Sequence, residues 1–185
     1  MATSPLPSLV SGLGIVRIGA VRMPASAASS AMLNWSDPYE QLIIEIAVPF
    51  YAGADVASLR FGNGNFLVDA GTNYQSRTVT LGAGTVTPLV DAPQTSDTMF
   101  RLGIATANGR KATIKITNFQ TRNKVLKADV SIGTTDATSV ADAHVSVEGM
   151  WANTNDFIKS CQLVLPGAGK MGTGTQFIVY GMNAA

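Results

Sequence analysis

The clearest structural signal in the sequence is a two-residue alternation between Lys111 and Ile132, which reads KATIKITNFQTRNKVLKADVSI. In its first half, every second residue is apolar, at Ala112, Ile114 and Ile116. In its second half, the same spacing recurs at Leu126, Ala128, Val130 and Ile132. Because successive side chains of a strand point to opposite faces, this spacing predicts two strands, each with one buried and one wet face. The polar segment 118–123 between them predicts a hairpin connection.

The same alternation recurs along the chain and predicts strands at residues 15–23, 32–35, 42–50, 56–61, 77–81, 99–105, 143–151, 158–165 and 176–182. Segments rich in glycine, asparagine and proline separate these runs, as expected of turns. The alanine-rich segment 25–31 is short and has no apolar stripe, which predicts a loop or a single helical turn. Many short strands without a convincing helix indicate an all-β protein, an antiparallel β-sandwich of jelly-roll type with about ten strands.

A chain of 185 residues has the size of one ordinary domain. We therefore expect residues 23–185 to form a single jelly-roll-like β-sandwich around one core. Residues 1–22 precede the regular alternation and are expected to form an N-terminal arm that contacts a neighbouring subunit. Leaving its apolar side chains in water would cost free energy, at Leu6, Leu9, Val10 and Leu13 among others. The alternative is that residues 15–23 add a strand to the sheet of the same chain.

The composition favours protein partners. Charged residues make up only 14% of the chain and the formal net charge is +1, while 46% of the residues are hydrophobic. A surface with so little net charge resists association weakly, which suits a subunit that packs against copies of itself. The 13 Lys and Arg residues are spread along the sequence, so we expect no nucleic-acid partner, because phosphate binding needs them clustered. We also expect no membrane partner, since no apolar run reaches the roughly 18 residues that span a bilayer.

Side chains that could perform chemistry are scarce. His144 is the only histidine, and it falls on the polar side of a predicted strand, where we expect a solvated residue and not a general base. Cys161 is the only cysteine and shares a strand face with Leu163, which predicts a small buried hydrophobe. The loop PGAGKM at residues 166–171 lacks the first glycine and the Ser or Thr of a phosphate-binding loop. We therefore expect no catalytic residue, no cofactor and no metal ligand.

Six aspartates near the predicted loops could in principle supply a glycosidase pair or an oxygen-lined calcium site: Asp69, Asp91, Asp97, Asp136, Asp142 and Asp156. Their spacing follows neither pattern. Aspartate is common in loops because its side chain bonds to nearby backbone amides. We expect these residues to form turns and to keep the protein soluble.

Several short motifs follow one another in a characteristic order. Leu59-Arg60-Phe61 precedes Gly62-Asn63-Gly64, and Gly71-Thr72-Asn73-Tyr74 comes next. Further along stand Ile116-Thr117-Asn118-Phe119, Gly149-Met150-Trp151-Ala152-Asn153-Thr154 and Gly174-Thr175-Gln176-Phe177-Ile178-Val179-Tyr180-Gly181. This order, over about residues 30–182, resembles the jelly-roll-type β-sandwich module of tailed-bacteriophage virion and tail-fibre structural proteins. The chain departs from the module at Phe66-Leu67-Val68, inserted before Asp69, and at Val179, which replaces a leucine.

The resemblance implies a bacteriophage virion structural protein, such as a capsid decoration, head-fibre or tail-associated subunit assembled in the host cytoplasm. Its implied partners are copies of itself, as a homo-oligomer, and other virion proteins. The family brings no catalytic residues, so the chain is not expected to be an enzyme. Trp151 and Phe177 are then core residues, which agrees with their place on strand faces that also carry valines.

A second hypothesis is a host-receptor or carbohydrate-binding domain of a phage tail or spike. Such a domain would use exposed aromatic side chains in loops, for example Trp35, Tyr51 or Tyr74, or a sugar-stacking platform at Trp151 or Phe177. A third hypothesis, a polysaccharide-cleaving enzyme, requires convergent titratable groups, which the sequence pattern does not supply.

Overall fold

The computed structural model describes residues 14–63, 68–82, 89–90, 94–103, 106–133 and 143–183. Within these residues the fold is all-β, with fourteen strands in antiparallel pairs. They are β1 (Ile15–Arg22), β2 (Leu33–Asn34), β3 (Gln41–Asp55), β4 (Ser58–Gly62), β5 (Tyr74–Gly82), β6 (Leu89–Val90), β7 (Gln94–Asp97), β8 (Phe100–Arg101), β9 (Thr106–Thr117), β10 (Lys124–Ile132), β11 (Ala143–Trp151), β12 (Ser160–Val164), β13 (Lys170–Met171) and β14 (Gln176–Met182). Four of these strands have only two residues, which leaves ten longer ones.

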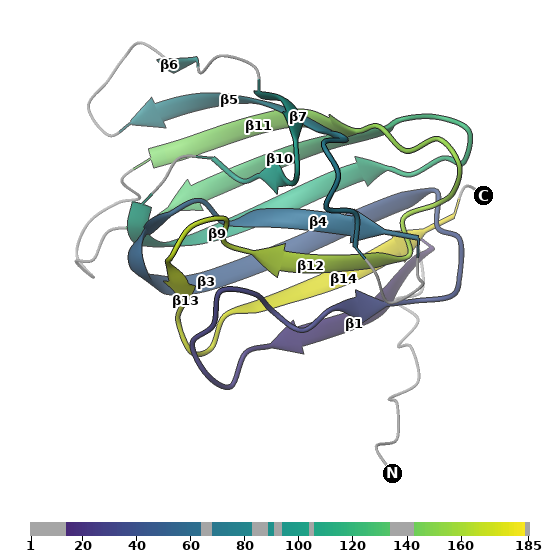
Figure 1. Cartoon of the computed structure of the whole chain (residues 1–185). Coiled ribbons are helices and arrows are strands. Elements are labelled where there is room, and N and C mark those ends of the chain that lie inside the picture. Colours follow the sequence, from purple (N-terminus) through teal and green to yellow (C-terminus); the bar gives the residue numbers. More distant parts are fainter. Residues whose placement is uncertain are drawn as a thin grey trace.

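The strands form two layers. A ten-stranded sheet has the order β1-β14-β3-β9-β10-β11-β5-β6, with β13 added to β3 and β7 added to β5. A four-stranded sheet has the order β2-β12-β4-β8 and lies in front of the large sheet in Figure 1. The predicted antiparallel β-sandwich is confirmed, whereas its jelly-roll connectivity stays a prediction.

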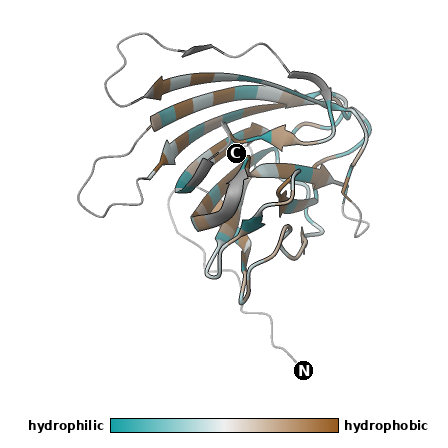
Figure 2. Cartoon of the chain, turned by 60° about the vertical axis from the view of Figure 1, so that its left-hand side comes forward, coloured by the Kyte–Doolittle hydropathy of each residue, from teal (hydrophilic) through white to brown (hydrophobic). Residues whose placement is uncertain are grey.

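One hydrophobic core lies between the two sheets, and period-two alternation supplies it. The burial pattern of β10 alternates without exception, with Leu126, Ala128, Val130 and Ile132 buried. Figure 2 shows the resulting brown and teal bands along the strands of the large sheet. The small sheet contributes buried apolar side chains at Leu59, Phe61, Cys161 and Leu163. Each strand of the large sheet therefore has an inner face in this core and an outer face turned away from the small sheet.

The central hairpin and the last strands match the sequence prediction closely. β9 and β10 pair from Val125↔Thr117 to Ile132↔Arg110, and β11 and β14 have the predicted bounds. β3 runs on to Asp55, beyond the predicted end at residue 50, because its far end pairs with β13 and β9. The alternation does not predict the short strands β6, β7 and β13, since two to four residues are too few to show a period.

The predicted boundary of the N-terminal arm is wrong. Residues 15–22 form β1, which pairs with β14 of the same chain from Ile15↔Met182 to Arg22↔Gln176. The pairing satisfies backbone amides and carbonyls and lets Ile18 and Val21 pack against the core. The arm is therefore limited to residues 1–13, which lie outside the described residues, and its contact with a neighbouring subunit stays a prediction.

Candidate binding surface

The outer face of the large sheet carries four parallel rows of side chains, set by the register of seven neighbouring strands. The first row is Arg22, Gln176, Ala47, Lys111, Ser131, His144 and Leu81. The second is Ala20, Ile178, Glu45, Thr113, Asp129, Ser146 and Val79. The third is Arg17, Tyr180, Ile43, Lys115, Lys127, Glu148 and Arg77. The fourth is Ile15, Met182, Gln41, Thr117, Val125, Met150 and Gln75.

Acidic and basic side chains of this outer face lie mainly in different rows. Both acidic residues of the second row, Glu45 and Asp129, flank Thr113. In the third row, Lys115 and Lys127 lie directly opposite each other on β9 and β10. This cross-strand pair is destabilising because like charges repel. Glu148 lies 3.6 Å from the ammonium of Lys127, but both side chains are more than half exposed, so water screens the ion pair. The second row therefore carries a net negative charge, and the adjacent third row, which also contains Arg17 and Arg77, carries a net positive charge.

Two shallow depressions of the outer face differ in their lining. One, of about 390 Å³, is lined by the polar and charged side chains of Glu45, Lys111, Asp129, His144 and Gln176 together with apolar residues such as Ala47 and Ile178. The other, of about 490 Å³, is lined by side chains of the third and fourth rows, including the apolar Ile15, Ile43, Val125 and Met182. Val125, in the fourth row, is 57% exposed. The face thus offers polar and apolar contacts side by side.

The lone histidine and the lone cysteine have the predicted environments. His144 is exposed on the outer face between Ser131 of β10 and Leu81 of β5. Cys161 is fully buried in β12, and burial raises the pKa of its thiol well above the usual value. A thiol that stays protonated at neutral pH is a poor nucleophile, so Cys161 serves as a small core residue.

The motif residues around Phe61, Tyr74 and Trp151 converge into one aromatic cluster on the inner side of the sandwich. The three ring centroids lie 6.1 to 6.2 Å apart, although the residues come from β4, β5 and the end of β11. The Tyr74 hydroxyl accepts a bond from the Phe61 amide at 2.8 Å and donates toward the Asp69 carbonyl at 3.1 Å. Trp151 is 1% exposed, which confirms its predicted core position. Tyr74 is fully buried, so its suggested role as an exposed sugar platform is wrong.

Asp69 joins this cluster to the loop before β5. Its carboxylate accepts bonds from Trp151 Nε1, Asn73 Nδ2 and the Gly71 amide, each at 2.8 Å. Burial alone would raise the pKa of the Asp69 carboxyl, but these bonds outweigh burial and hold the pKa below its usual value. Asp69 is thus a structural acceptor.

Asp69→Asn is expected to reduce the acid sensitivity of the fold. Because the folded-state pKa is lowered, Asp69 stabilises the fold above its unfolded pKa of about 3.9, and this contribution is lost as pH falls through the folded pKa. Urea unfolding at neutral and acidic pH measures the effect. The native chain should lose more free energy of unfolding than Asp69→Asn. Asp37→Asn, at an exposed position outside the outer face, is the control and should behave as the native chain; equal losses in all three would contradict the assignment.

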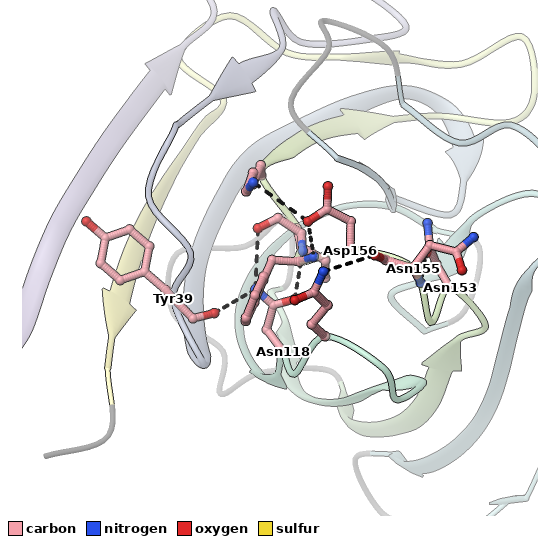
Figure 3. Close-up of polar contacts among 9 residues, drawn as sticks. Tyr39, Asn118, Asn153, Asn155 and Asp156 are labelled. Carbon is pink, nitrogen blue, oxygen red and sulfur yellow. Dashed lines mark hydrogen bonds and ion pairs between the residues drawn. The ribbon is translucent and has the colours of Figure 1, made fainter.

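A second group of motif residues holds the loop before β12. Asn118 is fully buried, and its side chain accepts a bond from the Ile158 amide at 2.7 Å and donates to the Tyr39 carbonyl at 2.7 Å (Figure 3). The ring of Tyr39 lies against Gly181, where an added Cβ would come within 2.3 Å of the ring. The Asn-Phe and Tyr-Gly motifs therefore meet at Tyr39, and Gly181 is needed because any larger side chain would displace that ring.

Glycine in the Gly-Met-Trp motif has a similar steric cause. A Cβ at Gly149 would come within 2.2 Å of the Gln75 carbonyl oxygen and 2.6 Å of the Phe100 ring. The edge of Phe100 thus occupies the place of the missing side chain. Phe177, in the last motif, is 1% exposed and belongs to the core as predicted.

The other candidates from the sequence have separate positions. Trp35 is partly buried and packs against the core, while Tyr51 lies in β3. Asp97 pairs with Arg101, and Asp156 lies 3.6 Å from the Lys159 ammonium; Asp91, Asp136 and Asp142 lie outside the described residues. In the loop before β13, the Gly167 amide donates to Asp55 at 3.0 Å.

Within the described part of the chain, His, Cys, Asp and Glu form no group of three that could hold a metal. No helix among the described residues is suited to crossing a bilayer.

Comparison with known proteins adds a distant likeness. No protein-family model and no curated protein matches the chain. Among solved structures, it is similar to an alginate lyase mutant in complex with an alginate tetrasaccharide. The sequences are 11% identical, the match covers 92% of this chain and 81% of that chain, and the TM-score is 0.35. A likeness at this level says nothing about a ligand or a reaction of this chain.

The sequence does not reveal the outer face as a surface. Its polar residues are visible as the wet half of each alternation, but which residues lie side by side depends on strand order and register. That Glu45 and Asp129 share a row follows only from the pairing of β3, β9 and β10.

Proposed function

We propose that the chain is a non-enzymatic structural subunit of a bacteriophage particle, in the capsid decoration, in a head fibre or in a tail-associated position. It acts by packing against copies of itself and other virion proteins, and it uses no cofactor. The order of the sequence motifs supports the virion assignment, and five residues of these motifs are buried in the sandwich, namely Phe61, Tyr74, Asn118, Trp151 and Phe177. These buried motif residues stabilise the fold, and contacts with partners are therefore made by surface residues.

The observation that carries the assembly role is the outer face of the large sheet. The small sheet covers the inner face, and the outer face presents four rows of side chains over seven strands. A non-obligate interface is, as a whole, only about as apolar as the rest of a protein surface, so this mixture of exposed apolar, acidic and basic groups is compatible with one. The low net charge of +1 leaves little general repulsion between copies.

Deletion of residues 1–13 tests the contribution of the N-terminal arm. These residues directly precede β1, the edge strand of the large sheet, and carry four large aliphatic side chains. If they pack on a neighbouring subunit, the truncated chain should self-associate more weakly and enter particles less often, while its β-rich circular dichroism stays unchanged. Sedimentation velocity and quantification of the subunit in purified particles measure the two effects. Incorporation at the native level would show that the arm is not an assembly element.

The depression around Asp129 and His144 favours a second candidate function, binding of a glycan on the host surface. Carboxylate, amide, ammonium and imidazole groups meet there around Asp129, Lys111, His144 and Gln176, and such groups can bond to sugar hydroxyls. A glycan array with the native chain and Asp129→Asn tests this candidate. Selective binding that the variant loses would favour it over pure assembly, and the absence of binding on the array would count against it.

A further inference from the structure

We infer that the outer face of the large sheet is a two-fold interface with a second copy of this chain, in which the acidic second row lies over the basic third row. The inference rests on the proposed assembly role and names the surface and the partner. It follows from the charges of the rows, from their geometry and from the area they cover.

The charges of the isolated chain are incompletely balanced. Lys115 and Lys127 face each other across β9 and β10, and among the described residues the one carboxylate that pairs with either is Glu148, at 3.6 Å from Lys127. Asp129, one row away, forms no ion pair within the described part of the chain. A surface carrying unmatched charges of both signs in adjacent rows is complementary to a copy of itself that is turned over.

A two-fold axis parallel to the rows, midway between the second and the third, brings these charges together. Rotation about this axis places each second-row residue over the third-row residue of the same strand in the other copy. Asp129 of β10 then lies over Lys127 of the second copy, and Thr113 lies over Lys115. Because Glu45 and Asp129 flank Thr113, the ammonium of Lys115 comes between two carboxylates of the second copy.

The same rotation covers the apolar part of the face. The first row lies over the fourth row, so Ser131 lies over Val125 and His144 lies over Met150 of the second copy. The depression lined by Ile15, Ile43, Val125 and Met182 is enclosed between the sheets. Face-to-face sheets pack about 10 Å apart with their strands within about 30° of each other, which this axis allows.

The area is sufficient for a specific dimer. With strands about 4.8 Å apart and a rise of about 3.3 Å per residue, seven strands and four rows span roughly 29 by 20 Å. That is roughly 600 Å² between the outermost Cα positions, before side chains at the rim are added. A standard interface buries about 800 Å² on each partner.

A charge exchange between positions 127 and 129 tests the inference. Lys127→Asp places the new carboxylate over Asp129 of the other copy twice in each dimer, and Asp129→Lys places two lysines over each other. Each single variant should weaken self-association of the full chain by about tenfold or more, because like charges across an interface are strongly unfavourable. The double variant, Lys127→Asp with Asp129→Lys, should restore association. An equimolar mixture of the two single variants should also associate, since each carries the charge that the other requires.

Sedimentation velocity over a range of protein concentrations gives the association constants, and circular dichroism checks that each variant folds. Glu148→Gln is the matched control, because it removes the ion pair with Lys127 inside one chain, while its side chain lies over the uncharged Ser146 of the second copy. This control should associate as the native chain does. Added salt should weaken association of the native chain.

Each alternative outcome has a defined meaning. If the native chain associates and all variants associate equally well, the outer face is not the interface, whereas the assembly role survives. A native chain that stays monomeric at every concentration contradicts the inference and the packing of the subunit against copies of itself. Glycan binding by a monomeric native chain, lost in both single variants, would make the face a glycan-binding surface and the inference wrong.

Discussion

Trp151→Ala is expected to lower the free energy of unfolding by about 3 to 5 kcal/mol, which is the usual cost of removing a large aromatic side chain from a core. The indole is 1% exposed and packs against the rings of Phe61 and Tyr74, so its removal leaves a cavity between β4, β5 and β11. It also removes the bond from Nε1 to the Asp69 carboxylate. Urea or thermal unfolding followed by circular dichroism measures the loss.

Trp151→Phe separates the two contributions. Phenylalanine keeps an aromatic ring in the cluster but cannot donate to Asp69, so this variant should lose less stability than Trp151→Ala. The sugar-platform hypothesis makes the opposite prediction. If Trp151→Ala unfolds like the native chain and loses binding to a glycan, the residue is part of a binding site and the core assignment is wrong.

Asn118→Ala is expected to cost about 3 kcal/mol, although it deletes only a small polar group. The side-chain amide bonds the Ile158 amide, the Ile158 carbonyl and the Tyr39 carbonyl, and all three groups lie in connections that the strand ladders do not satisfy. Removing Asn118 leaves a buried backbone donor and acceptors without partners, and each such group costs about 1 to 3 kcal/mol. The free energy of unfolding from urea titration gives the result.

A nearby exposed amide provides the control for Asn118. Gln120 lies in the same connection and bonds the Asn155 carbonyl at 3.3 Å, but its side chain is exposed. Gln120→Ala should therefore cost less than about 1 kcal/mol. Similar losses in the two variants would show that the loop before β12 does not depend on Asn118.

The structural roles of Trp151 and Asn118 explain why particular residue types stand in their motifs. Trp151 and Asn118 each close a contact between segments that lie far apart along the chain: Trp151 bonds Asp69, 82 positions earlier, and Asn118 bonds Tyr39, 79 positions earlier. Each of these motif residues has a steric or hydrogen-bonding cause in the fold. A shared motif order of this kind is a statement about architecture, and function has to be argued from the surface.

The local sequence determines the fold class and which residues of each long strand face the core. Apolar residues at every second position place Leu126, Val130 and Val145 in the core whatever strands lie beside them, because the side-chain period of a strand is two. The burial of Cys161 and Trp151 follows in the same way. The short strands β6, β7 and β13 lie beyond this reasoning because they are too short to show a period. Alternation also does not say which strands pair, so it does not decide that residues 15–22 join the sheet of their own chain.

The burial of Tyr74 and the arrangement of residues on the outer face are decided by the tertiary structure. The sequence around Tyr74 resembles an exposed loop, yet β4 and the Asp69 loop enclose its ring and give its hydroxyl three backbone partners. The rows that set Asp129 beside Thr113 and Lys127 opposite Lys115 arise from the register of strands that are distant in sequence. Local periodicity determines which side of a strand a residue occupies, whereas its neighbours on that side are determined by long-range backbone pairing, which the alternation of one strand does not encode.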